Sequence, residues 1–375
     1  MWIPKADCTG CGACAARCPK DAISMEKDKE GFLYPQTDPM LCVDCDLCRR
    51  VCPSLQGVVC HETPVAVAAK HKDDAVRQKS SSGGVFTGLA QRILDRGGVI
   101  CAAVYDENFA VVHKIGAEIA PFRGAKYAQS YAGHLFPELQ SLLKEGKQVL
   151  FVGTPCQCAG LSRYLGKTPE NLVLVDMICH GVPSREVWKA YLFSHAQRPM
   201  GTVNMRSKSS GWSHYGYSVE IHSGETYTCP QNRDPYMRGF TANLFLRPSC
   251  SKCNFKGLER CTDMTLGDFW GIWDLLPEFD DNKGTSLLLI HSEKGRALWD
   301  EIQNEFDHHP FDPQQAISSN PSAEISSPPH PKRDEFFKRL WHEHFDKLVW
   351  DCLEPKPQKT SLLRRALGRI RRGRK

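Results

Sequence analysis

Two runs of four cysteines near the start of the sequence have a spacing suited to one-electron chemistry. Each run reads C-x2-C-x2-C-x3-C-P, and each cysteine of the second run lies 34 positions after its counterpart in the first. These short gaps let the chain curl around a 4Fe–4S cubane, which takes three thiolates from one run and the fourth from the other. The predicted ligand sets are Cys8, Cys11, Cys14 and Cys52 for one cluster, and Cys42, Cys45, Cys48 and Cys18 for the other.

Disulfides and paired zinc sites are the alternatives for these eight thiols. Disulfides need an oxidising compartment, and the first residues of the sequence contain no apolar stretch typical of a secretory signal. Zinc sites rarely combine this series of short gaps with a terminal Cys-Pro. We therefore predict that residues 1–60 form a two-cluster ferredoxin unit of the bacterial type. The repeat implies two small hairpin-and-helix halves, with short strands at Ala22–Met25 and Gly31–Tyr34.

Four later cysteines are predicted to hold a third 4Fe–4S cluster. Cys250 and Cys253 form a CxxC pair, which supplies too few thiolates for a cubane alone. Cys156 and Cys179 each follow the end of an apolar run that is typical of a parallel strand. Since ligands of open α/β sheets collect at the carboxyl ends of parallel strands, both thiols should lie at one edge of the sheet.

Other assignments of these cysteines stay open at this point. Cys261 competes as the fourth ligand, and a zinc knuckle of Cys250, Cys253, Cys261 and a histidine is the alternative to a cubane. A buried cysteine that acts as a small hydrophobic residue is an alternative for both Cys156 and Cys179. The remaining thiols are interpreted as structural, namely Cys60, Cys101, Cys158, Cys229 and Cys352.

A flavin is the expected partner of the clusters, because it couples one-electron to two-electron chemistry. The strongest signal for it is Ser80–Gly84, which precedes a predicted helix. Its hydroxyls, glycines and free N–H groups suit a pyrophosphate, whereas an ordinary serine cap with a glycine turn is the alternative. Gly124–Ser130 adds a cation, an aromatic ring and hydroxyls, and its alternative is a surface turn.

The whole composition is that of a globular protein with more than one domain. The chain has 375 residues, of which 41% are hydrophobic and 24% charged. No apolar run is long enough for a transmembrane helix, and many cysteines without an export signal lead us to expect a cytoplasmic protein. The net charge of +5 is small and concentrated at the end of the sequence, which argues against nucleic-acid binding.

Strands and helices must alternate after residue 60 to position these groups, which predicts a mixed α/β core. The fold class is thus a small diferredoxin domain followed by a mixed α/β (α+β or α/β) flavin-binding core. The domains are predicted at 1–60, 61–200, 201–310 and 311–375. The expected strands are Val65–Ala69, Val99–Tyr105, Val111–Ile115, Gln148–Val152, Leu172–Ile178, Tyr215–His222, Glu225–Cys229 and Ser286–His291. The expected helices are 85–94, one that follows the turn Gly153–Gln157 and runs through Leu165, Arg185–Ala196, Arg233–Leu246, Lys294–Phe306 and Lys332–Val349.

Two segments near the end are not assigned to the core. Residues 310–331 are rich in proline and serine and are interpreted as a linker or a wrapped arm. Leu362–Lys375 contains seven Arg or Lys residues and no acid. Its four apolar residues would suit peripheral contact with an anionic membrane surface. A solvated basic end is favoured, because no second anchor is visible.

Six short motifs occur in series along the core. They are Ser81–Phe86, Lys126–Ser130, Gly153–Gln157, Cys179–Ser184, Cys250-x2-Cys253 and Thr265–Gly271. In this order they resemble the family of coenzyme F-420 hydrogenase/dehydrogenase beta subunits, fused to a two-cluster ferredoxin. The resemblance covers roughly residues 1–310.

The resemblance implies an FAD-binding core that passes electrons between clusters and a substrate or deazaflavin. Ferredoxin-fused members also occur beside polysaccharide-building enzymes, so the family name is a poor guide to substrate. One departure is Ala125, where many relatives carry serine. The cofactor-binding residues expected on this basis are Ser81, Ser82, Gly83, Gly84, Lys126, Tyr127, Ser130 and Thr154.

We therefore predict an iron–sulfur flavoprotein oxidoreductase whose electrons enter at the ferredoxin unit. Its partner would be an electron donor or acceptor protein, either a ferredoxin or a partner enzyme. The alternative is a non-catalytic, ferredoxin-like electron-transfer subunit without flavin. No catalytic residue is assigned, and His180, Asp268 and Lys126 are candidates for proton transfer beside a flavin.

Overall fold

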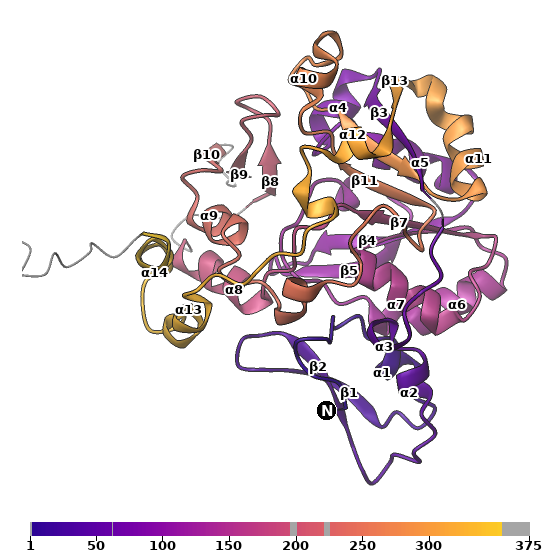
Figure 1. Ribbon diagram of the computed structural model, residues 1–375, viewed down its shortest axis with the longest axis vertical. Helices are drawn as coiled ribbons and strands as arrows, with labels where there is room; N and C mark the ends of the chain where they lie inside the picture. The colour runs from indigo at the N-terminus through magenta and orange to yellow at the C-terminus, as the bar shows by residue number, and fades with distance from the viewer. Residues whose placement is uncertain (1, 62, 196–200, 221–225, 355–375) are drawn as a thin grey trace, which may run out of the picture.

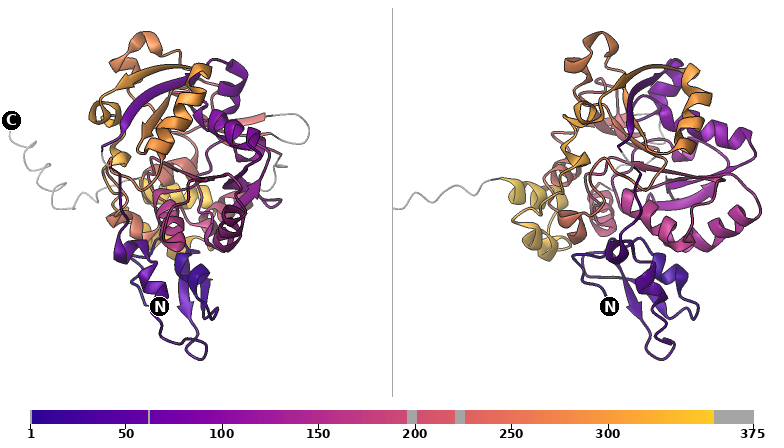
Figure 2. Two further views of the ribbon diagram at one scale, coloured as in Figure 1. Left: turned by 90° about the vertical axis from the view of Figure 1, so that its right-hand side faces the viewer. Right: turned by 45° about the vertical axis from the view of Figure 1, so that its right-hand side comes forward.

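The computed structural model describes residues 2–61, 63–195, 201–220 and 226–354. A small N-terminal unit lies against one end of a larger α/β core (Figure 1), and the two further views in Figure 2 show the same arrangement. The basic tail, and with it the predicted membrane contact, lies outside the described residues. No helix among the residues described is long and apolar enough to cross a membrane.

The N-terminal unit repeats its helices but not its strands. Helices α1 and α2 begin 34 positions apart, at Ala13 and Leu47, as the cysteine repeat requires. The prediction of two hairpin-and-helix halves is wrong, since strands β1 and β2 pair with each other in one antiparallel hairpin between the cysteine runs. After the second run the chain leaves toward the core, where His61 N–H donates to Arg260 O. The elements are α1 (Ala13–Arg17), β1 (Ile23–Lys27), β2 (Leu33–Thr37), α2 (Leu47–Arg50) and α3 (Pro53–Gln56).

An eight-stranded mixed sheet forms the centre of the core, which confirms the predicted mixed α/β class. Strands β4, β6, β7 and β11 are parallel, and β3 runs in the same direction because β12 is antiparallel to both β11 and β3. Their carboxyl ends therefore meet at one edge. In spatial order the strands are β13 (Phe306–Phe311), β3 (Val65–His71), β12 (Ser286–Ile290), β11 (Met264–Asp268), β7 (Leu172–Met177), β6 (Val149–Val152), β4 (Val99–Tyr105) and β5 (Val111–Gly116).

Helices cover both faces of this sheet, because successive strand residues point to opposite sides. In β6, Leu150 packs with helices α5 and α11, whereas its neighbours Val149 and Phe151 pack with α6 and α7. All three side chains are fully buried. The helices are α4 (Asp74–Lys79), α5 (Val85–Asp95), α6 (Phe136–Lys144), α7 (Pro155–Leu165), α10 (Ile272–Leu275), α11 (Glu293–Ile302) and α12 (Pro313–Ile317).

Strand β13 corrects two boundaries expected from the sequence. The predicted helix Lys294–Phe306 ends at Ile302, and Phe306 instead begins β13, whose end enters the segment read as a linker. Pairing with β3 outweighs the local composition there. Pro310 has no N–H to donate, and it is tolerated because β13 is an edge strand. In an edge strand, every second N–H faces away from the neighbouring strand and needs no partner in the sheet.

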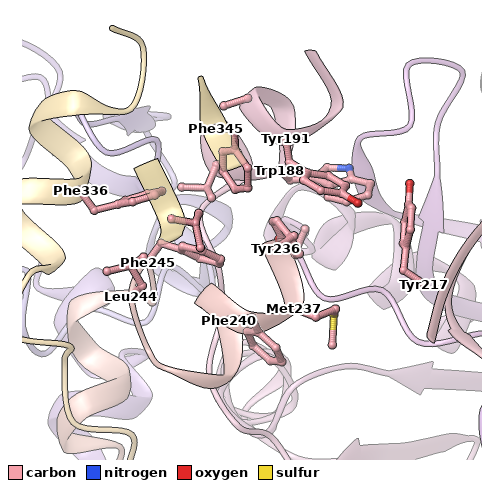
Figure 3. Close-up of a cluster of buried hydrophobic side chains, with 14 of the residues drawn as sticks. Trp188, Tyr191, Tyr217, Tyr236, Met237, Phe240, Leu244, Phe245, Phe336 and Phe345 are labelled. Carbon is pink, nitrogen blue, oxygen red and sulfur yellow. The ribbon is translucent and has the colours of Figure 1, made fainter. Parts of the chain in front are cut away.

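A second layer of helices packs beside the sheet around an aromatic cluster (Figure 3). Trp188, Tyr236 and Phe345 come from α8, α9 and α14 and are nearly fully buried. A three-stranded antiparallel sheet borders this layer. The elements are α8 (Arg185–Ser194), β8 (Val203–Ser207), β9 (Gly216–Glu220), β10 (Thr226–Pro230), α9 (Pro235–Thr241), α13 (Arg333–Arg339) and α14 (Phe345–Leu353).

Two helices in this layer are shorter than predicted. The segment Lys332–Val349 forms α13 and α14 rather than one helix, because His344 adopts an extended conformation that lets both halves turn toward the same aromatic cluster. The segment Arg233–Leu246 ends its helix at Thr241, since Asn243 takes a positive φ of 61°. The turn predicted between β9 and β10 lies outside the described residues.

The N-terminal unit is joined to the core by close backbone contacts and buried cations. The Cα of Gly12 lies against Gly133, where a Cβ on Gly133 would come within 2.7 Å of it. Arg333 forms an ion pair with Glu30, with 2.6 Å between Nη2 and Oε2, and also donates to Leu246 O. Helix α1 packs on α7 (Figure 1). The two units therefore share one packed interface.

Candidate functional site

A cavity of about 480 Å³ opens at the edge where the parallel strands end. Its walls come from the turn before α5, the 122–130 loop, the ends of β6, β7 and β11, and the N-terminal unit. This volume lies within the usual range of about 300–1,000 Å³ for small-molecule sites. Seven of the eight predicted cofactor-binding residues line it: Ser81, Ser82, Gly84, Lys126, Tyr127, Ser130 and Thr154.

The serine–glycine turn is fixed to the sheet by its side chains. Ser82 Oγ donates to Thr285 O at 2.8 Å, and Gly83 N–H donates to Ser286 Oγ at 2.9 Å. Ser81 Oγ accepts the N–H of Ala125 at 2.7 Å, so the two motifs that were expected near a flavin are in direct contact. Gly84 then begins α5 with a φ of 97° and no side-chain cap from the described residues. Val85 and Phe86, the first two residues of α5, line the cavity.

Gly83 is the residue of this turn that packs directly on the sheet, and replacing it with alanine should destabilise this wall of the cavity. A Cβ there would collide with Ala69 O and would lie 2.6 Å from Ser286 N. Since both are backbone atoms of the sheet, we expect a loss of about 3 kcal/mol in unfolding free energy. Anaerobic thermal unfolding would measure it. Gly116→Ala is the control, because its Cβ would meet only the ring of Phe122 at 3.3 Å; equal destabilisation by both variants would contradict this packing.

Lys126 orders the neighbouring loop. Its ammonium donates to the carbonyl oxygens of Phe122, Arg123 and Gly124 at 3.4, 2.9 and 3.0 Å. Burial lowers the pKa of Lys126 to about 7. An ammonium has three N–H donors, all of which have a backbone partner here. Its charge therefore lies beside the cavity, and its proton-transfer role stays a prediction.

The wall opposite is built by the start of α7. Thr154 caps this helix in a capping box with Gln157, whose side-chain amide also donates to Ser130 O at 3.0 Å. Thr154 Oγ1 lies 3.2 Å from Cys156 Sγ. The cap explains why Thr154, Ser130 and Cys156 come together, since one helix start positions all three.

The four core cysteines line a second, smaller hollow directly beside the cavity. Cys156, Cys179, Cys250 and Cys253 come from three separate segments and converge there. Burial first, and then the neighbouring thiols, raises the pKa of Cys156 well above its usual value and that of Cys179 to about 12. Such thiols stay protonated without metal, whereas bound metal ions would deprotonate them. Four thiols are the donor set that a 4Fe–4S cubane takes, and this third cluster stays a prediction.

Cys261 belongs to a different neighbourhood. Burial, followed by Asp176 and Cys60, raises the pKa of its thiol to about 12. Cys261 is not among the residues that line the hollow of the CxxC pair, which the zinc-knuckle alternative needs. Across the described ranges, no group of three or more His, Cys, Asp or Glu side chains is arranged for a single metal ion.

The N-terminal thiols divide into an inner and an outer set. Cys8, Cys11, Cys14 and Cys52 line one small hollow and are buried, as the crossed ligand pattern predicts. Burial is the main reason why the pKa of Cys11 is raised to about 12, and Cys52 and Cys8 add to it. The outer set is more open, and Cys45 is exposed. The outer set comprises Cys18, Cys42, Cys45 and Cys48.

Thr9 connects these places. It lines the hollow of the inner thiols, the hollow of the core thiols and the large cavity. No sequence pattern selects Thr9, because only its position next to Cys8 brings it to the junction. The three hollows are therefore contiguous through one residue.

Two buried arginines at the site were also missed by the sequence reasoning. Arg206 pairs with Asp268, with 2.8 Å between Nη1 and Oδ2, and its guanidinium stacks on Tyr215 at 3.7 Å. Arg247 lies between the inner and the core thiols. The only sequence signal for Arg206 is a cation at an inward-facing position of β8. The only signal for Arg247 is its place three residues before the CxxC pair.

His180 and Asp268, the other proton-transfer candidates, both line the cavity. His180 Nδ1 lies 3.2 Å from Ser322 Oγ, and burial lowers the pKa of its imidazole. Asp268 accepts from Trp212 Nε1 at 3.0 Å and is held by Arg206. His180 also lines the core-thiol hollow, so it is the candidate that borders both places.

Comparisons with known families agree with this architecture. Residues 66–133 match the N-terminal region of "Coenzyme F420 hydrogenase/dehydrogenase, beta subunit", and residues 146–313 match its C-terminal region. Residues 7–55 match the 4Fe-4S dicluster domain. The chain is thus an iron–sulfur protein of an oxidoreductase class. It belongs to the family of coenzyme F420 hydrogenase/dehydrogenase beta subunits.

Individual relatives cover parts of the chain. A polypeptide of the F(420)H(2) dehydrogenase of Methanosarcina mazei is 27% identical over 188 residues, which are 46% of this chain and 53% of that protein. The chain thus spans about half of the length of that relative. Ferredoxin Fdx2 of Sorangium cellulosum is 35% identical over 89 residues, covering 20% of this chain and 83% of the ferredoxin. A chain from the F420-reducing [NiFe] hydrogenase complex of Methanosarcina barkeri aligns with a TM-score of 0.47 and 18% identity, over 77% of this chain and 90% of that one.

Proposed function

We propose that this protein is an iron–sulfur flavoprotein oxidoreductase that moves electrons from its N-terminal clusters to a flavin in the 480 Å³ cavity. The observation that carries the proposal is the contiguity of the inner thiols, the core thiols and the cavity at Thr9. A flavin exchanges two electrons with a substrate, whereas each 4Fe–4S cluster carries one at a time. A core cluster between the two would therefore serve as the connection.

The residues around the cavity fit a flavin nucleotide. The uncapped start of α5 and the Ser81–Gly84 turn offer N–H groups to an anionic phosphate. Tyr127 and Trp270 provide aromatic surface, and Lys126 and Arg206 provide positive charge. Asp176 lines the wall, and burial raises the pKa of its carboxyl to about 6. These groups would orient the ligand and exclude water from it.

The substrate is proposed only as a class. It would be a two-electron acceptor or donor that reaches the flavin through the cavity mouth. The names of the relatives make the deazaflavin F420 the first compound to test. The polysaccharide-biosynthesis context, the cytoplasmic location and a redox partner protein remain predictions from the sequence.

Anaerobic purification with iron, sulfide and extracted-flavin assays tests the proposal. We expect about twelve irons and about one flavin per chain. Ser81→Trp should expel the flavin while iron is retained, because Ser81 lines the cavity but no thiol hollow. Ser141→Trp on the exposed face of α6 is the matched control. A fully metallated chain without flavin would overturn the proposal in favour of the non-catalytic electron-transfer subunit.

A further inference from the structure

Arg247 is a buried cation at the junction between the two units. Its side chain is 2% exposed. Nε donates to Cys8 O at 2.8 Å and Nη2 donates to Leu33 O at 2.8 Å, so its fork holds two backbone carbonyls of the N-terminal unit. The guanidinium also stacks on the ring of Tyr34, 4.4 Å from its centroid. Arg247 is therefore fixed in place by the inner cluster's own loop.

No carboxylate forms an ion pair with this charge within the part of the chain that the structure describes. Nη1 has no hydrogen-bond partner there, and the space beside it is filled by Gly10, whose Cβ position lies 2.8 Å from it. A buried charge without a counter-charge is strongly unfavourable. Arg333 provides the contrast, because it crosses the same interface but is paired with Glu30.

Thiols lie on both sides of Arg247. Nη2 lies 3.7 Å from Cys8 Sγ. On its other side, Arg247 lines the hollow of the four core cysteines, and its carbonyl accepts the N–H of Cys250 at 3.0 Å. A 4Fe–4S cluster with four thiolates is anionic, and its reduction potential depends on nearby charge and on hydrogen bonds to sulfur. The unpaired cation thus faces two sites that would supply negative charge.

We propose that Arg247 is the shared counter-cation of the inner cluster and the core cluster, and that it raises the reduction potential of the inner cluster so that the outer cluster can reduce it. The proposal rests on the cluster content of the proposed function, not on its flavin. Each transfer is one electron, lost by the outer cluster and gained by the inner one. Reduction adds negative charge to the inner cluster, and burial makes this added charge unfavourable. The positive guanidinium of Arg247 offsets that cost.

An anaerobic redox titration followed by electron paramagnetic resonance tests this role. In Arg247→Gln, the ratio of reduced inner cluster to reduced outer cluster should fall about tenfold at a fixed ambient potential. A fall of this size corresponds to the loss of one hydrogen bond to a charged group. Arg333→Gln is the control, since it removes an interface cation that contacts no thiol. A Cys14→Ser variant assigns the inner signal.

The outcomes are distinct. An unchanged ratio in Arg247→Gln, or an equal change in Arg333→Gln, would overturn the proposal. Arg247→Lys covers the case in which the glutamine variant loses iron, because lysine keeps the charge but not the planar fork. The lysine variant should show a smaller fall, because it keeps the charge, and a full fall of about tenfold together with full iron would also overturn the role of the charge. Flavin content is measured separately, so a missing flavin counts against the proposed function and leaves this result intact.

Discussion

Replacing Cys250 with alanine should lower the iron content of the anaerobically reconstituted protein by about four per chain, together with an equal loss of acid-labile sulfide. The reason is the convergence of Cys250 with Cys156, Cys179 and Cys253 on one hollow. Removing one of four thiolates weakens the hold on a core cubane, so we expect the variant to lose it, whereas the N-terminal clusters use none of these residues. The measurement is iron, sulfide and zinc analysis of variant and parent prepared side by side.

The matched control for this variant is Cys158→Ala. Cys158 is a buried thiol on α7, two residues from Cys156, but its Sγ donates to Val175 O inside the sheet. We expect full iron content in that variant. Iron unchanged in Cys250→Ala, with zinc lost instead, would contradict the core cluster and support a zinc site at the CxxC pair.

Removing the carboxylate of Asp268 should have the largest effect on stability among the cavity residues. Arg206 is 3% exposed and forms its one ion pair in the described residues with Asp268. Asp268→Ala would leave this cation buried without a counter-charge, which costs roughly 3–5 kcal/mol. In a chain of this size, the anaerobic thermal midpoint should fall by roughly 4–6 °C.

An exposed ion pair provides the comparison for Asp268. Arg96 and Glu301 are 41% and 39% exposed, so Glu301→Ala should change stability by less than about 1 kcal/mol. The double variant Arg206→Met with Asp268→Leu should recover part of the loss, because it removes both charges together. Equal shifts for Asp268→Ala and Glu301→Ala would rule out the buried pair as a support of the cavity wall.

The sequence predicted the elements that follow strong local patterns. The strand Val99–Tyr105 has the expected bounds, because its apolar run is a local pattern. The helix through Leu165 ends as expected but begins at Pro155, inside the predicted turn Gly153–Gln157. The resemblance to the family also implied that Ser81, Lys126 and Thr154 would share one cofactor site. Those residues do line one cavity.

What the sequence left open depends on contacts between distant segments. Strand β13 forms because it pairs with the edge of β3. No local pattern near Phe306 indicates this pairing. Arg206 and Arg247 look like ordinary surface cations in the sequence, and only tertiary packing buries them. The role of Lys126 was equally hidden, because its three carbonyl partners belong to its own loop conformation.

The close approach of Gly12 and Gly133, described above as packing, also limits how this protein can exchange electrons. Backbone packed directly against backbone favours a fixed position of the N-terminal unit on the core. A carrier domain that swings between partners instead needs freedom to rotate. Under the proposed function, a redox partner would therefore bind at the outer thiols, which are the more open set, and leave again at each turnover. Diffusional encounter at that surface, rather than domain motion, would then limit the rate of electron supply.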